Sequence, residues 1–502
     1  MRLAFLILTA GLIALAHADD RIARHYRIGK VAIPPEIDPQ IGALAPTSDA
    51  KVAACFHHGE VAIYDPQKQT WQKFAEGLHE PLGLLAEKDG SILVMQRPEL
   101  TRLRDKDGDG VAESYETVWD GFGITGNYHE YAFGPVLAPN GKLLVALNCA
   151  SGADTVFREV RGEWLNVGLE REKFYGDWKK VSAQVGRMYS RVPWRGWVME
   201  FDPVTREATP FASGFRSPDG IGFDADGRLL VTDNQGDWRG TNELHVVERG
   251  GFYGHPASLP WRKDWTEGDP EKVPVERLEA LRTRPAIQFP YGRYANSPTQ
   301  PVVIPRSAAW GPFGGQVIVG EMNSPRLLRT WIERVDGAWQ GGCVALLDTP
   351  PVKRGINRLL FVGDTLYVGR IHLAWAGDEG LGTVEPTGAF PFDAVDMKIT
   401  QNGFRFSFTE PLARTASDLS RWKGERYNYA YHPTYGSPEL NKSDLAFAKV
   451  TLVENDTVAN VEVNGFQPGF IYDFDLTMLE SAKGETPLNP HIAYTANRLP
   501  KP

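Results

Sequence analysis

Residues 214–238 read GFRSPDGIGFDADGRLLVTDNQGDW. Two short apolar runs, Ile221–Phe223 and Leu229–Thr232, lie on either side of Asp226-Gly227. An Asp-Gly pair between such runs predicts a β-hairpin with a tight type I′ turn, because both turn residues must tolerate positive φ. The second strand runs into a polar, glycine-containing loop at 233–237, where a rigid sheet can present groups to a ligand. We therefore expect this stretch to combine a scaffold hairpin with part of a site.

The same pattern of apolar run, turn pair and second apolar run recurs along the chain. The units lie at Ile41–Cys55, Leu82–Val94, Gly134–Val145, Asp219–Val231, Ala309–Val319 and Ile356–Val368. Repeated hairpins at blade-like intervals predict an all-β fold with a six-bladed β-propeller over residues 25–385, which closes radially and leaves only short edges exposed. A β-sandwich is the alternative, but the even number of units favours the propeller. The long intervals after the third and fourth units predict insertions at about 150–200 and 253–300, packed over one face.

The pattern changes near Pro386–Phe392. Residues 397–408 alternate as a hairpin, and later β-type runs lie at 448–453, 458–463 and 470–476. These short strands predict a C-terminal β-sandwich domain of immunoglobulin or fibronectin type over residues 392–502. Helix signals are scarce, and Glu271–Leu281 has the spacing of a short helix.

The N-terminus has the features of a secretory signal peptide. An apolar run at Leu3–Ala16 follows Met1-Arg2, and Ala16-His17-Ala18 supplies an A-x-A cleavage signature. The run is too short to span a membrane comfortably, so residues 1–18 predict a periplasmic or secreted protein. No later stretch predicts a membrane span. The net charge of −9 argues against nucleic acid or an anionic membrane surface as the main partner.

The cysteine pattern excludes some kinds of site. Cys55, Cys149 and Cys343 allow at most one intramolecular disulfide, and three buried thiols are an equally good interpretation. The sequence contains no C-x-x-C-H motif, so no covalently attached haem is expected, and it contains no C-x-x-C zinc motif.

Residues 105–116 read DKDGDGVAESYE and fit the calcium-loop pattern D-x-D-x-D-G-x5-E in full. The predicted metal ligands are the carboxylates of Asp105, Asp107, Asp109 and Glu116 and the backbone carbonyl of Val111. Gly110 permits the sharp turn. The preceding Leu100–Arg104 reads as a strand and not as a helix. We therefore expect a structural calcium ion in a blade loop and not a calcium sensor.

Three charged or titratable residues precede strands in different units: His129, Arg216 and Arg354. Loops on one face of a propeller converge on its axis, so these side chains predict a common site. A histidine can act as general base near neutral pH. Guanidinium groups suit a ligand that carries carboxylates or a quinone. Taken singly, each residue could equally be a structural histidine or a surface arginine.

Several motifs resemble those of the glucose/sorbosone dehydrogenase family. They are GFRSPDGIGF at 214–223, GRLLVTDNQG at 227–236, NEL at 242–244 and GGFYGHP at 250–256. Members of that family are six-bladed propellers that use pyrroloquinoline quinone (PQQ). The likeness covers roughly residues 40–375 and is greatest to the membrane-bound-type dehydrogenase propellers of planctomycetes and their relatives. Those proteins often carry the D-x-D-G-D-G loop, which is present here at residues 105–110. They often also carry an appended cytochrome c domain, which this sequence does not contain.

The resemblance implies roles for individual residues. His129 would remove the proton of a substrate hydroxyl as the catalytic base. Arg216 would contact cofactor and substrate, and Arg354 would supply a second guanidinium group to the quinone. Backbone carbonyls at Gly236 and Asp237 would hold a second calcium ion beside the quinone. The sequence departs from the family near Asn323, where the family has a cofactor-binding lysine.

Three functions are therefore expected, in this order. The first is an exported oxidoreductase that oxidises a sugar or polyol hydroxyl with PQQ and calcium and passes electrons to an external acceptor such as a cytochrome c. The second is a non-catalytic extracellular propeller that binds carbohydrate or protein, because one fold serves many functions. The third is a metal-dependent, lactonase-like hydrolase, which would need Asp219, Asn234 and Glu321 to converge at the axis.

Overall fold

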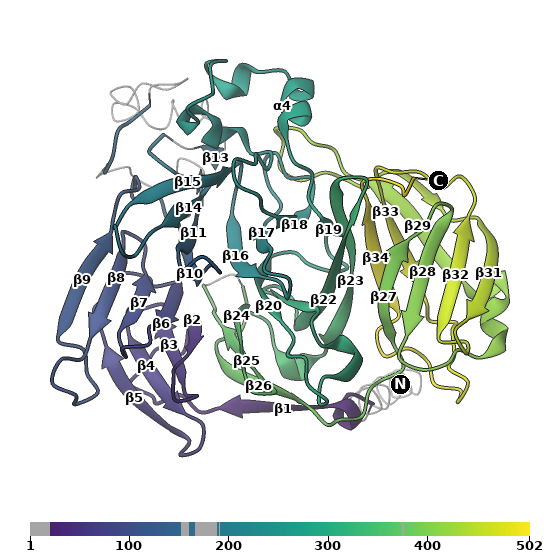
Figure 1. Ribbon diagram of the computed structural model, residues 1–502, viewed down its shortest axis with the longest axis horizontal. Coiled ribbons are helices and arrows are strands. Elements are labelled where there is room, and N and C mark those ends of the chain that lie inside the picture. Colours follow the sequence, from purple (N-terminus) through teal and green to yellow (C-terminus); the bar gives the residue numbers. More distant parts are fainter. Residues whose placement is uncertain (1–20, 152–159, 166–187, 190, 374–375, 502) are drawn as a thin grey trace, which may run out of the picture.

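The computed structural model describes residues 21–151, 160–165, 188–189, 191–373 and 376–501. The predicted signal peptide and most of the predicted insertion at 150–200 lie outside these residues. The described chain consists mostly of antiparallel β-sheets with few, short helices (Figure 1). Within the described ranges, no helix is both long and apolar enough to cross a membrane.

Between residues 26 and 386, the described strands form six units of four antiparallel strands. The first three are β2 (Ile41–Pro46), β3 (Val52–Phe56), β4 (Val61–Asp65) and β5 (Thr70–Ala75); β6 (Gly83–Ala86), β7 (Ile92–Met95), β8 (Leu100–Arg104) and β9 (Ser114–Trp119); and β10 (Ala132–Leu137), β11 (Leu143–Leu147), β14 (Trp197–Phe201) and β15 (Ala208–Ser213). The last three are β16 (Pro218–Phe223), β17 (Leu229–Asp233), β18 (Asn242–Val246) and β19 (Ile287–Phe289); β20 (Pro298–Val303), β21 (Val317–Glu321), β22 (Arg326–Val335) and β23 (Ala338–Asp348); and β24 (Ile356–Val362), β25 (Thr365–Arg370), β26 (Gly380–Pro386) and β1 (Tyr26–Val31). A short pair, β12 (Ala150–Ser151) and β13 (Met188–Tyr189), lies apart from these sheets.

The first strands of the units contact one another in cyclic order, from β2 through β6, β10, β16, β20 and β24 back to β2. The sixth unit takes its outer strand from the N-terminal side, because β1 pairs with β26. This ring of four-stranded sheets is consistent with the predicted propeller. Second strands such as β3, β7 and β11 are apolar and buried along their whole length, because neighbouring sheets cover both of their faces.

The turn at Asp226-Gly227 differs from the predicted type I′ hairpin. The backbone N–H of Asp224 donates to the carbonyl of Arg228 at 3.0 Å, so residues 225–227 form the loop. Of these loop residues, Gly227 has the positive φ, 78°. This is the three-residue hairpin in which a left-handed residue creates a bulge. The turn therefore requires the glycine, and the preceding aspartate need not adopt positive φ.

The fifth unit also differs from the prediction. Its first strand is β20, and residues 304–316 form a connection that includes the 3-10 helix η3 (Gly311–Phe313). The predicted hairpin at Ala309–Val319 therefore contains only the second strand. The predicted insertion at 253–300 likewise includes β19 and the start of β20, and its remainder carries η1 (Pro256–Trp261), η2 (Pro270–Lys272) and α4 (Val275–Leu281). The predicted helix at Glu271–Leu281 is divided by Pro274, which lies at the N-cap of α4.

The chain beyond β26 forms two further groups of strands. One is a four-stranded sheet of β27 (Ala394–Ile399), β28 (Gly403–Phe408), β32 (Val458–Val463) and β31 (Phe447–Val453). The other comprises β29 (Lys423–Asn428), β30 (Leu440–Asp444), β33 (Phe470–Asp475) and β34 (His491–Ala496), and it extends the sheet of the fifth unit because β34 pairs with β23. The remaining 3-10 helices are η4 (Pro350–Val352), η5 (Arg414–Ser417) and η6 (Leu419–Arg421). The C-terminal region, predicted as a separate sandwich, thus shares a sheet with the ring, beside β22 and β23 (Figure 1).

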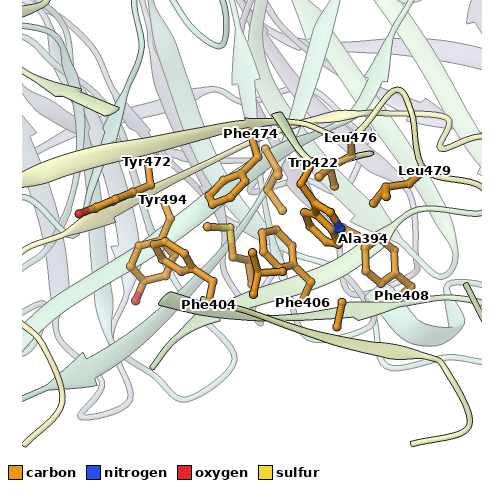
Figure 2. Close-up of a cluster of buried hydrophobic side chains, with 14 of the residues drawn as sticks. Ala394, Phe404, Phe406, Phe408, Trp422, Tyr472, Phe474, Leu476, Leu479 and Tyr494 are labelled. Atoms are coloured by element: carbon orange, nitrogen blue, oxygen red, sulfur yellow. The ribbon is translucent and has the colours of Figure 1, made fainter. Parts of the chain in front are cut away.

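A cluster of buried aromatic side chains joins these two groups of strands (Figure 2). Phe404 of β28 is fully buried, and its ring centroid lies 5.2 Å from that of Tyr472, 5.5 Å from that of Phe474 and 5.3 Å from that of Tyr494. The last three residues belong to β33 and β34. Alternation along Gly403–Phe408 places every second side chain in the cluster, as the sequence pattern predicted for this hairpin.

Cys55, Cys149 and Cys343 are buried free thiols. Burial raises the pKa of all three thiols. They therefore behave as small apolar core residues, which agrees with the second interpretation of the cysteine pattern.

Candidate functional site

A cavity of about 410 Å³ lies at the axis of the ring. Its lining comes mainly from the beginnings of first strands in five units and from the segments that follow the second strands β11, β17, β21 and β25. The described lining residues are Leu82, Tyr128, His129, Tyr131, Phe133, Asn148, Ser151, Arg216, Ser217, Asp219, Asn234, Gln235, Tyr291, Asn296, Ser297, Met322, Asn323, Asn357, Leu373 and Tyr435. Tyr435 comes from the C-terminal region, so that region completes the wall of the axial cavity.

A larger hollow of about 950 Å³ lies between the ring and the C-terminal strands. Two of its arginines pair with carboxylates of the same lining: Arg326 lies 2.6 Å from Asp348, and Arg293 contacts Glu425 and lies 3.2 Å from Asp473. The described lining of this hollow includes neither His129 nor Arg216, the residues that the sequence predicts to share a site. We therefore place the candidate site in the axial cavity.

His129 lies on the loop before β10 and faces this cavity. Buried Asn127 anchors the loop, because its side-chain oxygen accepts hydrogen bonds from the backbone N–H groups of His129 (3.0 Å) and Ser151 (3.2 Å). The Nδ1 atom of His129 lies 2.9 Å from the carbonyl oxygen of Cys149. A carbonyl only accepts hydrogen bonds, so Nδ1 carries the proton of the neutral ring and Nε2 carries the lone pair. This is the tautomer that a general base acting through Nε2 requires.

One buried carboxylate positions Arg216 and Ser217. Asp233, the last residue of β17, accepts hydrogen bonds from the backbone N–H of Arg216 (2.9 Å) and of Ser217 (2.7 Å). Arg239 is fully buried, and its guanidinium lies 2.9 Å from the same carboxylate. The ion pair compensates the buried charge of Asp233 and fixes the backbone at the start of β16.

The side chain of Arg216 lies flat against Gly236. A Cβ atom at position 236 would stand 1.8 Å from Nε of Arg216, so only glycine fits. The guanidinium carbon lies 5.4 Å from the ring centroid of Tyr435, within reach of a cation–π interaction. Arg216 therefore reaches the cavity between a glycine of the ring and a tyrosine of the C-terminal region.

Asp219 lines the cavity, and the buried Arg358 contacts it without being among the described lining residues. Burial raises the pKa of Asp219 to about 6, although Arg358 and a hydrogen bond from Asn234 favour the charged form. Arg358 donates to the backbone carbonyl oxygens of Asp219 (3.1 Å) and Leu82 (3.2 Å), and its guanidinium carbon lies 4.7 Å from the ring centroid of Phe133. The cavity wall thus includes a carboxyl group that changes charge near pH 6, and a buried arginine holds the backbone of the same residue.

The residues predicted to hold a second calcium ion, Gly236 and Asp237, do not line the cavity. The carbonyl of Gly236 accepts a hydrogen bond from the N–H of Gly436 at 3.0 Å, and Asp237 pairs with Tyr435 in an isolated antiparallel bridge. A C-terminal segment therefore lies along this strand-end loop and uses backbone groups that the resemblance assigned to calcium.

Arg354 also lies away from the cavity lining. Its side chain is exposed, and its backbone N–H donates to Asp378 Oδ2 at 3.2 Å. Asn323 does line the cavity and presents a neutral amide where the resembling family has a lysine. The structure thus brings His129 and Arg216 together and leaves Arg354 outside their site.

The acidic loop gathers a different glutamate from the one predicted. Carboxylate oxygens of Asp105, Asp107, Asp109 and Glu113 all lie within 4.8 Å of one another, a group that could hold an ion. Glu116 instead contacts Arg206 and lies 2.6 Å from Arg104, and hydrogen bonds from these arginines lower its pKa to about 2. The predicted carbonyl ligand, Val111, lies between Asp109 and Glu113 in the sequence, and its N–H donates to Asp109 at 2.8 Å.

The residues expected for a lactonase-like metal site converge only in part. Asp219 and Asn234 line the cavity, whereas Glu321 accepts hydrogen bonds from the backbone N–H groups of Asn296 (2.9 Å) and Ser297 (3.0 Å) and contacts Ser324. Among the described residues, the acidic loop is the group of three or more His, Cys, Asp or Glu side chains close enough to share an ion.

Three contributors to the site were missed in the sequence: Ser217, Arg358 and Tyr435. Ser217 is adjacent to the predicted Arg216, so it could have been proposed as a site residue from its hydroxyl and its position in the sequence. Arg358 lies in the same Lys353–Arg358 segment as Arg354, but only the register of β24 shows which arginine points inward. Tyr435 comes from a segment without periodicity, so its place could not be inferred.

Comparison with known proteins gives one family model and a set of similar structures. The family model described as "Domain of unknown function (DUF7133)" matches residues 64–258. No curated protein matches the sequence. Similar solved structures include a PQQ-bound aldose sugar dehydrogenase from Streptomyces coelicolor (14% identity, TM-score 0.48, covering 72% of this chain and 99% of that one). They also include the PQQ domain of a pyranose dehydrogenase from Coprinopsis cinerea (11% identity, TM-score 0.46, 72% and 95%) and a calcium structure of a family AA12 carbohydrate-active enzyme from Trichoderma reesei (12% identity, TM-score 0.45, 72% and 96%).

The axial cavity does not fit PQQ. PQQ carries several carboxylates, which proteins bind through arginine and lysine side chains. Among the described lining residues, Arg216 is the single guanidinium or ammonium group, and the Asp219 carboxyl also faces the cavity. The groups predicted to hold calcium beside the quinone, Gly236 and Asp237, lie outside the lining. We therefore derive no reaction step through this cofactor.

Proposed function

We propose that the axial cavity binds a neutral sugar or polyol. The observation that carries this proposal is the chemistry of the lining, which is dominated by amides, hydroxyls and aromatic rings. The amide side chains are Asn148, Asn234, Gln235, Asn296, Asn323 and Asn357, and the aromatic ones are Tyr128, Tyr131, Phe133, Tyr291 and Tyr435. Amides and hydroxyls pair with sugar hydroxyls, and aromatic faces pack against the apolar C–H face of a sugar ring.

Two buried acceptors in the cavity support a ligand that donates hydrogen bonds. The Oδ1 atoms of Asn148 and Asn234 are buried and accept no hydrogen bond from the described residues. A buried unsatisfied acceptor costs about 1–3 kcal/mol, which a donor on a ligand would recover. Their amide nitrogens already donate, Asn148 to Ser217 at 3.2 Å and Asn234 to Ser297 at 2.9 Å, so both side chains are held in orientation. Sugar hydroxyls are donors of the required kind.

The size of the cavity suits such a ligand. Small-molecule sites commonly span about 300–1,000 Å³, and about 410 Å³ falls in the lower part of that range. Within this site, His129 supplies a hydrogen-bond acceptor at Nε2, and Arg216 supplies the one strong cation among the described lining residues. Oxidation of a bound hydroxyl with PQQ and calcium, which the sequence motifs imply, would place the same hydroxyl next to His129, but the lining does not supply the cationic partners of that cofactor.

We further propose that the protein acts outside the cytoplasm and carries calcium in the acidic loop. The leader at residues 1–18 supports export. The cluster of Asp105, Asp107, Asp109 and Glu113 supports a hard cation, because calcium prefers carboxylate oxygens. Asp105 already folds the loop, since its carboxylate accepts hydrogen bonds from the N–H groups of Gly108 (2.7 Å) and Gly110 (2.8 Å). Weak calcium sites of this kind are occupied at extracellular calcium concentrations.

Calorimetric titration of the purified protein with monosaccharides, polyols and aldonolactones tests the sugar site. We expect saturable binding of at least one of these compounds, and a loss of about fivefold or more in affinity for Asn234→Ala. Asn140→Ala is the matched control, because Asn140 lies exposed in a turn of the ring and should leave binding unchanged. Absence of binding across the panel would overturn the proposal.

A parallel titration with PQQ and calcium tests the alternative. If PQQ binds and sugars then reduce a dye, the cavity accommodates the cofactor with Arg216 as the single cationic side chain of its described lining.

A further inference from the structure

We propose that Ser217 is a nucleophile with His129 as its general base, so that the axial cavity cleaves a carboxylic ester or lactone. The two side chains face each other in the cavity: Ser217 Oγ lies 3.4 Å from His129 Nε2. Nucleophile–base pairs are often somewhat longer without substrate than the usual hydrogen-bond distance. The substrate class, an ester or lactone of a sugar acid or acylated polyol, rests on the proposed sugar site, whereas the Ser217–His129 pair does not.

The hydrogen bonds around this pair have a defined direction. The carbonyl of Cys149 can only accept, so it takes the Nδ1 proton of His129 and leaves a lone pair on Nε2. Nε2 can then only accept, so the hydroxyl proton of Ser217 is the one between the two side chains. The amide nitrogen of Asn148 donates to Ser217 Oγ at 3.2 Å, which occupies an acceptor site on the oxygen and leaves its proton for His129. The chain of donors therefore places the serine proton on the path to the base.

Buried contacts hold the serine at the cavity wall. Its backbone N–H donates to Asp233 at 2.7 Å, and the Asp233 carboxylate is paired with fully buried Arg239. Ser217 itself is 5% exposed, and Pro218 follows it at the start of β16, where the register shifts by a bulge. A nucleophile anchored on a rigid strand end needs little reorganisation to react.

The neighbouring Arg216 supplies the positive charge that an acyl-transfer step needs. It lines the same cavity, and its contacts with Gly236 and Tyr435 fix its side chain. Developing negative charge on the carbonyl oxygen of an ester is stabilised by a fixed donor or cation in a partly desolvated site. Arg216 therefore takes the stabilising role beside the nucleophile.

The reaction balances without a metal or redox partner. Ser217 Oγ attacks the ester carbonyl carbon and its proton passes to His129 Nε2. The bond to the alcohol oxygen breaks, and that oxygen leaves with the proton from His129, which produces an acyl-serine. Water, deprotonated by the same Nε2, then attacks the acyl carbon, releases the acid and restores the serine hydroxyl.

Labelling with a fluorophosphonate tests the nucleophile directly. We expect one adduct per chain by intact mass, mapped to Ser217 by peptide sequencing, and hydrolysis of p-nitrophenyl acetate that the same label abolishes. Ser217→Ala and His129→Ala should each lose the label and at least about tenfold of the hydrolysis rate. Ser307→Ala is the matched control, because that partly exposed serine lies outside the cavity lining and donates a hydrogen bond to Asp364 at 2.6 Å, and it should label as the wild type does.

A second variant keeps the test decisive if Ser217→Ala does not fold. Ser217→Cys retains a nucleophile of similar size and should react with iodoacetamide faster in the presence of His129 than in the double variant with His129→Ala. No label on the wild type, or a label that persists on Ser217→Ala, overturns the inference. Sugar binding is measured separately by calorimetry. Sugar binding without labelling would contradict the proposed nucleophile and support the sugar site. Labelling without sugar binding would support the nucleophile and contradict the sugar site.

Discussion

The imidazole of His129 donates from Nδ1 to the carbonyl oxygen of Cys149 across 2.9 Å. Cys149 follows β11, and its own N–H donates to the carbonyl of Arg216 at 3.0 Å. The residue that fixes the histidine tautomer is therefore also tied to the next unit of the ring. This arrangement aligns the lone pair of His129 with the serine and arginine at the start of β16.

Replacement of His129 by alanine should weaken sugar binding about five- to tenfold, because the cavity loses an oriented acceptor worth about 1–1.5 kcal/mol. Calorimetry with the best ligand of the sugar panel measures this change. His58→Ala is the matched control, since His58 is exposed and lies 3.3 Å from Asp38, away from the cavity lining. Equal affinities for the two variants would remove His129 from the site.

Replacement of Arg216 and of Arg354 by alanine should have clearly different effects on the affinity for sugar. Arg216 lines the cavity and contacts Tyr435, so Arg216→Ala should weaken sugar binding by about 1 kcal/mol or more. Arg354 is exposed outside the lining, so Arg354→Ala should leave the affinity within error of the wild type. A comparable loss in both variants would support the pair of quinone-binding arginines implied by the sequence motifs.

The fold was largely predictable because its local signals repeat. Most units of the ring contain two apolar runs around a turn, a pattern that is visible in the sequence. Five of the six predicted hairpins lie where the structure has them. The hairpin of the fifth unit was misplaced because its first strand, Pro298–Val303, contains two prolines and few apolar residues. The glycine pair at 314–315 also has the composition of a hairpin turn. The turn residues predicted strand pairs well, but they did not determine the turn geometry at Asp226-Gly227.

The site was less predictable because it depends on direction and on distant segments. His129 and Arg216, which their loop positions predict to lie together, both line the axial cavity. Loop position could not distinguish Arg354 from Arg358, since the difference depends on where β24 begins: Arg354 precedes the strand and is exposed, whereas Arg358 lies within it and is buried. Nor could it place Tyr435, which reaches the cavity from a region far along the chain by backbone pairing with Asp237.

Asp219 should make stability depend on pH in an unusual direction. Burial raises the pKa of its carboxyl from 3.8 to about 6 in the folded chain, so the folded protein binds a proton that the unfolded chain has released between these values. This contribution to stability is complete below about pH 3.8 and is lost as the pH rises through about 6. The loss amounts to about 3 kcal/mol.

Asp219→Asn isolates that contribution, because asparagine does not titrate. Denaturant unfolding of both proteins from pH 4 to pH 8 should show the variant gaining stability relative to the wild type as the pH rises through about 6. Asp393 is also buried with a pKa raised to about 6, and it remains in both proteins, so its effect cancels in the comparison. A pH-independent difference between the two proteins would show that Asp219 ionises normally.

The acidic loop offers a comparison between two glutamates. Glu113 lies with Asp105, Asp107 and Asp109, whereas Glu116 pairs with Arg104 and Arg206. Glu113→Gln should therefore weaken calcium binding more than Glu116→Gln, and calcium should raise the unfolding temperature of the wild type more than that of Asp107→Asn. Terbium luminescence and calcium titration measure these affinities. A larger loss for Glu116→Gln would restore the ligand set expected from the loop pattern.

Gly436 tests whether the C-terminal region shapes the axial cavity. Its φ is 62°, and its N–H donates to the Gly236 carbonyl at 3.0 Å. A Cβ atom at position 436 would stand 3.0 Å from the side chain of Gln235, which lines the cavity. Gly436→Ala should therefore displace the adjacent Tyr435 and weaken sugar binding, as measured by calorimetry.

Gly465→Ala is the matched control for this substitution, because Gly465 has a φ of 67° and a Cβ atom there would meet no other atom within 4 Å. Both substitutions carry a similar backbone strain of about 1 kcal/mol. Equal losses of stability, with a loss of affinity in Gly436→Ala alone, would therefore show that this segment positions the wall of the site. Unchanged affinity in Gly436→Ala would instead make the contact between the two regions purely structural.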